Sequence, residues 1–203
     1  KSGPARLSAT IATGRLDASV DFPAIAQGRA RLSLAVDGGA APPGLALGLR
    51  AEDVSAADLL PSLAGVTWLS GRGSLSASLS GSGQTQQEMI GSLTGSADIS
   101  LTGGALSGVG IAGGLGEVSQ RILEGWPASN SPTAFDTLSV TAKISDGIAA
   151  LTDFRLASSE LTMTGKGDVD LLRRALDLRV DPRLSAGTAA AGLPVAVAVT
   201  GPW

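Results

Sequence analysis

The chain has 203 residues and a formal net charge of -3, from 15 basic and 18 acidic side chains, and it contains no histidine and no cysteine. These absences exclude an imidazole base, a Ser-His-Asp triad, a zinc site of the usual nitrogen and sulfur type, a thiol nucleophile and a disulfide framework. The charge balance gives no basic surface for nucleic acid, while 43% hydrophobic residues suffice for one sizeable core.

The first part of the chain predicts four strands. Apolar and polar residues alternate over 6–13, 15–22, 29–36 and 45–50, and Gly, Pro and Asp residues separate these runs. Gly14 stands between the first two runs, where it favours a tight hairpin.

The middle of the chain predicts helices between strands. A short helix over 55–63 begins with Ser55 as its cap, and a strand follows over 67–79. The sequence Thr-Gln-Gln-Glu then forms a capping box that opens a helix over 85–93. A third helix is expected over 115–124, before a Gly-Trp-Pro stop.

The last part, from Thr133 to Val180, is a run of alternating strands with short turns. Alternation places every second side chain on the same face, so the pattern predicts antiparallel strands with one apolar and one polar face. Asp146-Gly147 reads as a hairpin turn. The side chains expected on the apolar face are Leu138, Val140, Ala142, Ile144, Ile148, Ala150, Phe154, Leu156, Leu161, Met163, Val169, Leu176, Leu178 and Val180.

Together these elements predict a mainly β fold. We expect a large curved, mostly antiparallel sheet with one apolar face, on which about three short helices pack or which they cap. The chain is expected to form a single domain over 1–203. It would comprise leading strands in 1–50, strands with three short helices in 51–127, and an antiparallel meander in 128–203.

Two motifs have a structural explanation that outweighs a chemical one. Residues 108–113 fit the G-x-G-x-x-G dinucleotide fingerprint, but the preceding run alternates in polarity and no acidic residue follows about 20 positions on. Asp168 and Asp170 share a strand face, yet they alternate with apolar residues and lie near basic ones, which favours a solvated face with ion pairs. We therefore expect no cofactor, no metal and no catalytic residue. Loss of a measurable activity in Asp168→Asn would be needed to support an enzyme.

A series of short motifs resembles the C-terminal region of the AsmA family. They include Gly81-Ser-Gly83 before a capped helix, Ser92-Leu-Thr-Gly95, Asp146-Gly-Ile148, Gly165-Lys-Gly-Asp-Val-Asp-Leu171 and Pro194-Val-Ala-Val-Ala-Val-Thr-Gly201. Their order and spacing carry the resemblance, which covers Leu45 to Trp203.

The resemblance implies a Gram-negative envelope protein in the periplasm. Such a protein is anchored to the inner membrane by an N-terminal helix, and it serves outer-membrane assembly and lipid homeostasis. Larger relatives carry phospholipids along a hydrophobic groove. The chain starts without Met and stops directly after a strand, so we expect a fragment whose anchor lies elsewhere.

Two hypotheses compete for the apolar face. In the first, it lines a trough for phospholipid or other acyl chains. In the second, the helices cover the face and the domain is a scaffold for envelope proteins. The candidate lipid-facing residues are Leu138, Val140, Ile144, Ile148, Phe154, Leu156, Leu161, Met163, Leu176, Leu178, Val195 and Val197.

Overall fold

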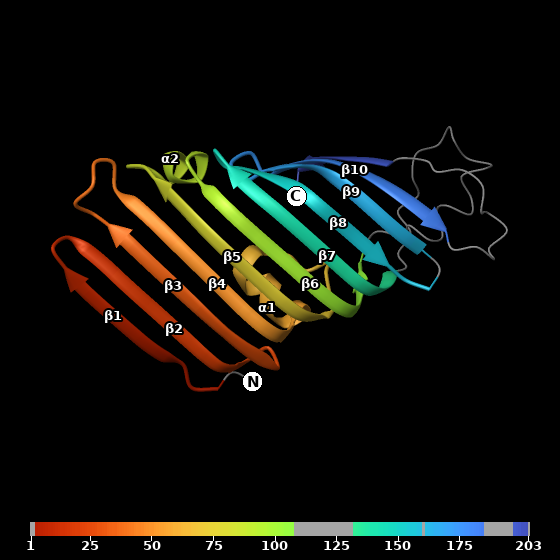
Figure 1. Cartoon of the computed structure of the whole chain (residues 1–203), viewed down its shortest axis with the longest axis horizontal. Coiled ribbons are helices and arrows are strands. Elements are labelled where there is room, and N and C mark those ends of the chain that lie inside the picture. The colour runs from red at the N-terminus through yellow and green to blue at the C-terminus, as the bar shows by residue number, and fades with distance from the viewer. Residues whose placement is uncertain (1–2, 108–131, 160, 185–196, 203) are drawn as a thin grey trace.

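A computed structural model describes residues 3–107, 132–159, 161–184 and 197–202. In these residues eleven strands form one sheet, in which each strand pairs antiparallel with the strands before and after it in the chain. The sheet is curved, and it is not closed because β1 and β11 each have a single neighbour (Figure 1). The expected fold class is thus confirmed at the level of a mainly β, antiparallel, curved sheet.

The strands and helices follow one another along the chain, and Figure 1 labels most of them. The first strands are β1 (Arg6–Ala12), β2 (Arg15–Ile25), β3 (Gly28–Asp37) and β4 (Gly44–Ser55), followed by α1 (Ala56–Ala64), β5 (Arg72–Ser82) and α2 (Gln86–Gly91). The remaining strands are β6 (Thr94–Leu106), β7 (Thr133–Ser145), β8 (Ile148–Ala157), β9 (Leu161–Asp170), β10 (Ala175–Leu184) and β11 (Val197–Pro202).

Tight turns with positive φ connect several neighbouring strands. Thr13 and Gly14 (φ 50° and 78°) join β1 to β2, and Asp146 and Gly147 (φ 50° and 73°) join β7 to β8. Positive φ at both central residues gives a turn whose twist matches that of the flanking strands. The two hairpins that the sequence predicts at these places are therefore present.

A register shift in β8 corrects one part of the sequence prediction. The pairing of β8 with β9 shifts between Leu151 and Phe154, so the alternation on the two sides of the shift is out of step. Ile148 pairs with Ser145 and Asp170 and is 45% exposed, whereas its neighbour Ala149 pairs with Ile144. The expectation that Ile148 and Ala150 share a face with Phe154 is wrong.

The two helices of the described residues differ in how they begin. At α2, Thr85 Oγ accepts a bond of 3.2 Å from the Glu88 N–H, as the capping box predicts. At α1, Ser55 makes no side-chain capping bond, and its N–H donates to the Ala26 carbonyl instead. Ser55 is thus the N-cap residue of α1, as predicted, but its side chain does not make the capping bond. No helix in the described part of the chain is long and apolar enough to cross a membrane.

The segment before β5 also differs from the expected strand over 67–79. The regular strand begins only at Arg72, and Leu69 forms an isolated bridge with Leu106. Ser70 donates its N–H to the Ala105 carbonyl, and Gly71 has φ 137°. The Leu69 side chain is only 6% exposed. This segment therefore packs into the core and does not continue the strand. The third expected helix, over 115–124, lies outside the described residues.

The main core lies under one helix and across the middle strands. Leu59 and Leu60 of α1 form one cluster with buried side chains of β4 to β9, whose largest fully buried members are Leu101, Leu156, Leu161 and Val54. A smaller cluster around Ala142, Ile144 and Ala149 includes the half-buried Leu79 and Leu93. Figure 1 shows both helices on the same side of the sheet. Within the described residues, the sheet therefore has one side that carries helices and one that does not.

Candidate functional site: aliphatic rows on the sheet

The helix-bearing side of the sheet carries aliphatic side chains in rows that cross the strands. Residues that pair directly in an antiparallel sheet share a face, so the strand registers define these rows. One row contains Leu7, Val20, Leu32, Leu49 and Ala77, the next contains Ala9, Ala18, Leu34, Leu47 and Leu79, and a third contains Ile11, Leu16, Val36 and Leu45. We call these side chains of β1 to β5 the aliphatic rows.

The aliphatic rows are accessible to solvent. Ile11 is 79% exposed and Leu7 is 71% exposed. The other members from β2 to β5 are half-buried. Leaving aliphatic surface in water is unfavourable by roughly 25 cal/mol per Å².

A pocket extends the aliphatic rows beneath α2. It has a volume of about 460 Å³ and lies between Leu45, Leu47 and Leu79 of the sheet and Met89 and Ile90 of the helix. Gln84, Thr85 and Gln86 line the same pocket next to the start of α2. The pocket is therefore mainly apolar, with polar groups along one part of its wall.

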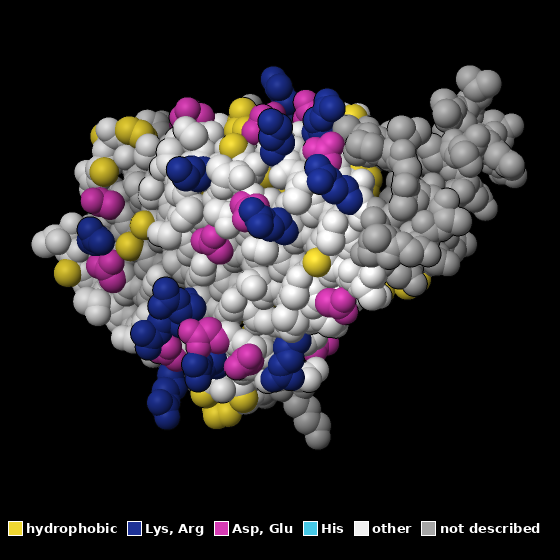
Figure 2. Space-filling model, turned by 45° about the vertical axis from the view of Figure 1, so that its right-hand side comes forward, with side chains coloured by type: hydrophobic (Ala, Val, Ile, Leu, Met, Phe, Trp, Pro, Cys, Tyr) yellow, Lys and Arg dark blue, Asp and Glu magenta, His cyan; other side chains and the backbone are white. Residues whose placement is uncertain are grey.

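The opposite side of the sheet is polar. Figure 2 shows a face on which charged side chains are spread among uncharged polar side chains and backbone, with hydrophobic side chains mainly at its margins. Arg31 and Asp21 form an ion pair across β2 and β3, and this hydrogen bond lowers the pKa of the exposed Asp21 carboxyl. Arg15 and Asp17 pair at 3.0 Å along one strand. Such exposed pairs contribute little to stability.

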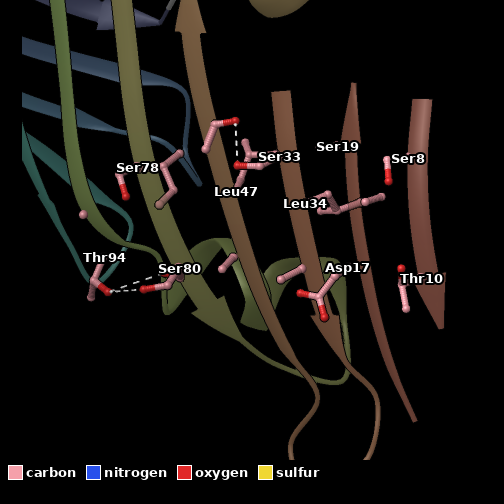
Figure 3. Close-up of a pocket in the computed structure, with 16 residues that line it drawn as sticks. Ser8, Thr10, Asp17, Ser19, Ser33, Leu34, Leu47, Ser78, Ser80 and Thr94 are labelled. Carbon is pink, nitrogen blue, oxygen red and sulfur yellow. Dashed lines mark hydrogen bonds between the residues drawn. The ribbon is translucent and has the colours of Figure 1, made fainter. Parts of the chain in front are cut away.

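A shallow hollow of about 580 Å³ lies on this polar side, over β1 to β6 (Figure 3). Hydroxyl side chains such as Ser19, Ser33 and Ser78 line it, and some of them bond to neighbouring strands. Ser33 Oγ donates to the Gly48 carbonyl at 3.4 Å, and the hydroxyls of Ser80 and Thr94 are 3.2 Å apart. The hydroxyls of Ser33, Ser80 and Thr94 in this hollow therefore bond to one another or to the backbone.

The carboxylates that the sequence singled out have structural partners. Asp170 Oδ1 accepts the N–H groups of Leu172 and Arg173 at 3.0 and 2.8 Å, which stabilises the turn after β9. Asp168 is exposed and pairs in register with Ala150 and Asp177. In the described part of the chain, no group of three or more acidic side chains could hold a metal ion. Residues 108–113, with the glycine-rich motif, lie outside that part.

Many of the predicted lipid-facing residues are core residues. Leu138, Ile144, Leu156, Leu161 and Met163 are all buried, and all lie on the helix-bearing side by register. Val140 and Phe154 of the same strands, and Leu176 and Leu178 of β10, are half-buried on that side as well. Val195 lies outside the described residues, as does the side chain of Val197.

The sequence prediction missed the aliphatic rows as a candidate site. Their strands were predicted, but the candidate residues were all taken from the second half of the chain. The signal was available, because 6–13, 15–22 and 29–36 alternate in the same way as 133–145. Alternation alone cannot tell which part of a face is covered by other side chains.

The described strands thus form an open antiparallel meander with aliphatic rows on one side and a polar opposite side. The family model that matches this chain is that of the AsmA family, over residues 9–154. The chain belongs to the AsmA family. The match begins earlier than the resemblance described above, within β1, so it includes the aliphatic rows apart from Leu7. Neither the curated proteins nor the solved structures give a match.

Proposed function

We propose that this chain is a non-enzymatic envelope domain that holds the acyl chains of phospholipid against the aliphatic rows. The observation that carries the proposal is the accessibility of these rows from β1 to β5. Each methylene that leaves water contributes about 0.8 kcal/mol. Rows of Leu, Val and Ala without polar interruption suit a flexible chain better than a directional ligand.

The pocket beneath α2 supports the same function. Leu45, Leu47 and Leu79 belong both to the aliphatic rows and to the pocket wall. An acyl chain that lies on the rows can therefore enter the pocket without crossing a polar barrier. Membership of the AsmA family is consistent with this role in lipid homeostasis or outer-membrane assembly.

We further propose that the domain acts in the periplasm, held at the inner membrane by a helix that precedes it in a longer polypeptide. Family membership supports this location. Fractionation of cells, with protease treatment of spheroplasts, tests it in the native protein. Protection of the domain from protease added outside the inner membrane would contradict the proposal.

The lipid-binding proposal is tested by native mass spectrometry and by solvent extraction of the purified chain. We expect phospholipid to co-purify with the chain. Leu47→Asn should lower the lipid occupancy by about tenfold, because an acyl chain that covers the introduced amide removes it from water at a cost in free energy. Ala46→Asn is the matched control because Ala46 is exposed on the same strand and faces the other side. It should keep the lipid.

The alternative function is a scaffold whose apolar side is covered by its own helices. One observation favours it: α1 shares the main core with the buried side chains of β6 to β9. Hydrogen exchange separates the two functions. Purified protein without lipid, in which the amides of β1 to β5 are as protected as those of β6 to β9, would reject the lipid proposal and support the scaffold.

A further inference from the structure

The pocket beneath α2 ends in core side chains on its β6 side. Leu79 and Leu93 line the pocket, and both also pack against the smaller core cluster. The buried members of that cluster, on β7 and β8, are each at most 8% exposed. On the opposite side, Leu47 of the pocket wall pairs in register with Leu34 of the aliphatic rows. The pocket is therefore continuous with the rows toward β3 and closed toward β6.

Hydrogen bonds fix the position of α2 over the pocket. Ser92 Oγ accepts the Ser82 N–H at 2.7 Å and donates to the Ser82 carbonyl at 2.6 Å, which ties the end of the helix to β5. The Gly147 N–H donates to the Leu93 carbonyl at 3.1 Å, at the turn between β7 and β8. A Cβ at Gly147 would lie 2.6 Å from the Ile90 carbonyl oxygen, so the turn and the helix are in close contact. These contacts give the pocket a fixed depth.

The side chains that α2 places over the pocket are Met89 and Ile90. Both are half-buried. None of the described residues that line the pocket is charged, and the polar ones lie at 84–86, next to the start of the helix. A volume of about 460 Å³ is in the range of pockets for small ligands. Such a lining suits the methyl end of an acyl chain better than its ester or phosphate end.

We propose that the pocket beneath α2 is the terminal subsite for one acyl chain, and that Met89 and Ile90 set the length of the chain that fits. This inference rests on the proposed function and names the place where the bound chain ends. The chain lies on the aliphatic rows, enters from the β3 side and stops at Leu79 and Leu93. Each methylene that enters the pocket strengthens binding by about fourfold, whereas a methylene beyond its depth gains nothing. Binding therefore has a preferred chain length.

Substitutions at Met89 test the preferred length in both directions. Native mass spectrometry is applied to lipid-free protein incubated with an equimolar mixture of saturated phosphatidylglycerols of increasing acyl length. Met89→Ala deepens the pocket and should shift the preference to longer chains, and Met89→Trp fills the pocket and should shift it to shorter chains. The bound ratio of lipids that differ by two methylenes per chain should change by about tenfold. Alanine favours the helix, so circular dichroism should show that Met89→Ala folds.

Two control variants separate the pocket from its surroundings. Gln87 is exposed on the same helix and does not line the pocket, so Gln87→Trp should keep the preference of the unmodified chain. Leu32 belongs to the aliphatic rows but lies outside the pocket. Leu32→Ala should therefore lower the occupancy of all chain lengths alike and leave the preferred length unchanged.

Photoreactive phospholipids test where the chain ends. One probe carries a diazirine at the methyl end of an acyl chain, and a second probe carries it next to the ester. After irradiation, mass spectrometry of proteolytic peptides should find the first probe on residues 84–93. The second probe should label β1 to β3 instead, because the ester end of the chain lies outside the pocket.

Three results would overturn the proposal while leaving lipid binding intact. The first is the same preferred length in the unmodified chain and in both Met89 variants. The second is a shift of the preferred length by Leu32→Ala as large as that caused by Met89→Ala, since the rows would then determine the length. The third is equal labelling of 84–93 by both probes. A chain that binds none of these lipids would reject the proposed function and this inference together.

Discussion

Gly95 of β6 lies on the helix-bearing side, where the backbone of β5 leaves no space for a side chain. Its φ is 145°, and a Cβ at this position would lie 1.9 Å from the Ser78 carbonyl oxygen. Gly95 pairs with Leu79 and Ile144, so it occupies a row position where the other strands carry aliphatic side chains. The absence of a side chain here allows the backbones to keep their register.

Gly95→Ala should destabilise the fold because both the backbone conformation and the space exclude a methyl group. We expect a loss of about 1–3 kcal/mol in the free energy of unfolding, measured by urea denaturation. Gly91→Ala is the matched control, since a Cβ at Gly91 meets no atom within 4 Å and alanine favours the helix that it ends. Equal stability of the two variants would contradict the assigned role of Gly95.

The ion pair of the Asp21 carboxylate on the polar side contributes little to the stability of the fold. Its pKa is lowered by the bond from Arg31, so its stabilising effect is present above the ordinary carboxyl pKa and is lost as pH falls through the lowered value. Because both groups are exposed, this effect is small. The proposed lipid binding therefore rests on the aliphatic side chains rather than on the ion pairs.

At the scale of single elements, α2 is short and depends on its cap. Thr85 Oγ accepts the Glu88 N–H, while Glu88 Oε2 accepts the Gln84 N–H at 2.8 Å. A helix of six residues has little stability of its own. These two bonds therefore hold the cover of the apolar pocket in place.

Thr85→Ala should loosen α2 by about 1 kcal/mol. Hydrogen exchange should show faster exchange of the amides in 88–93, with little change in the strands. Ser55→Ala provides the control, because Ser55 stands at the N-terminus of α1 but makes no side-chain capping bond. A comparable increase of exchange in α1 after Ser55→Ala would show that the capping bond is not the cause.

At the scale of the whole molecule, the sheet is divided into a covered and an accessible part. β6 to β9 contribute Leu101, Leu138, Leu156, Leu161 and Met163 to the main core, and each is at most 3% exposed. β1 is exposed throughout, and β2 and β3 contribute mainly half-buried side chains. Stability should therefore fall from the middle strands toward the β1 edge.

Native-state hydrogen exchange should show this gradient. We expect the amides of β7 and β8 to exchange only by global unfolding, while those of β1 and β2 exchange through local opening. Bound lipid should slow exchange in β1 to β5 more than in β7 and β8. Uniform protection from β1 to β8 in lipid-free protein would contradict the proposed division of the sheet.

Much of the fold could be predicted from local pattern. Alternation identified β1 to β4 within a few residues, and Asp146-Gly147 and Gly14 identified two hairpins, because turn chemistry and side-chain period are local properties. The errors arose where a local irregularity changed the period. The shift between Leu151 and Phe154 moved Ile148 to the polar side, and Gly71 ended the regular pairing before β5.

The candidate site was predicted less well, and the reason lies in burial. Leu156 and Leu34 have the same side chain and the same alternating context, yet Leu156 is buried and Leu34 is half-buried. Leu156 belongs to the main core, which also contains Leu59 and Leu60 of α1 from a distant part of the chain, whereas Leu34 does not belong to it. No pattern near either leucine contains that information.

The sequence by itself determined that this protein is an antiparallel sheet with alternating faces, without histidine or cysteine chemistry, and with the motifs of the AsmA family. These properties follow from residue type and from periods of a few residues. Only the tertiary structure decided that the described strands form an unclosed sheet and that the accessible aliphatic rows lie in β1 to β5. Closure and coverage depend on contacts between residues far apart in the chain, which local pattern does not encode.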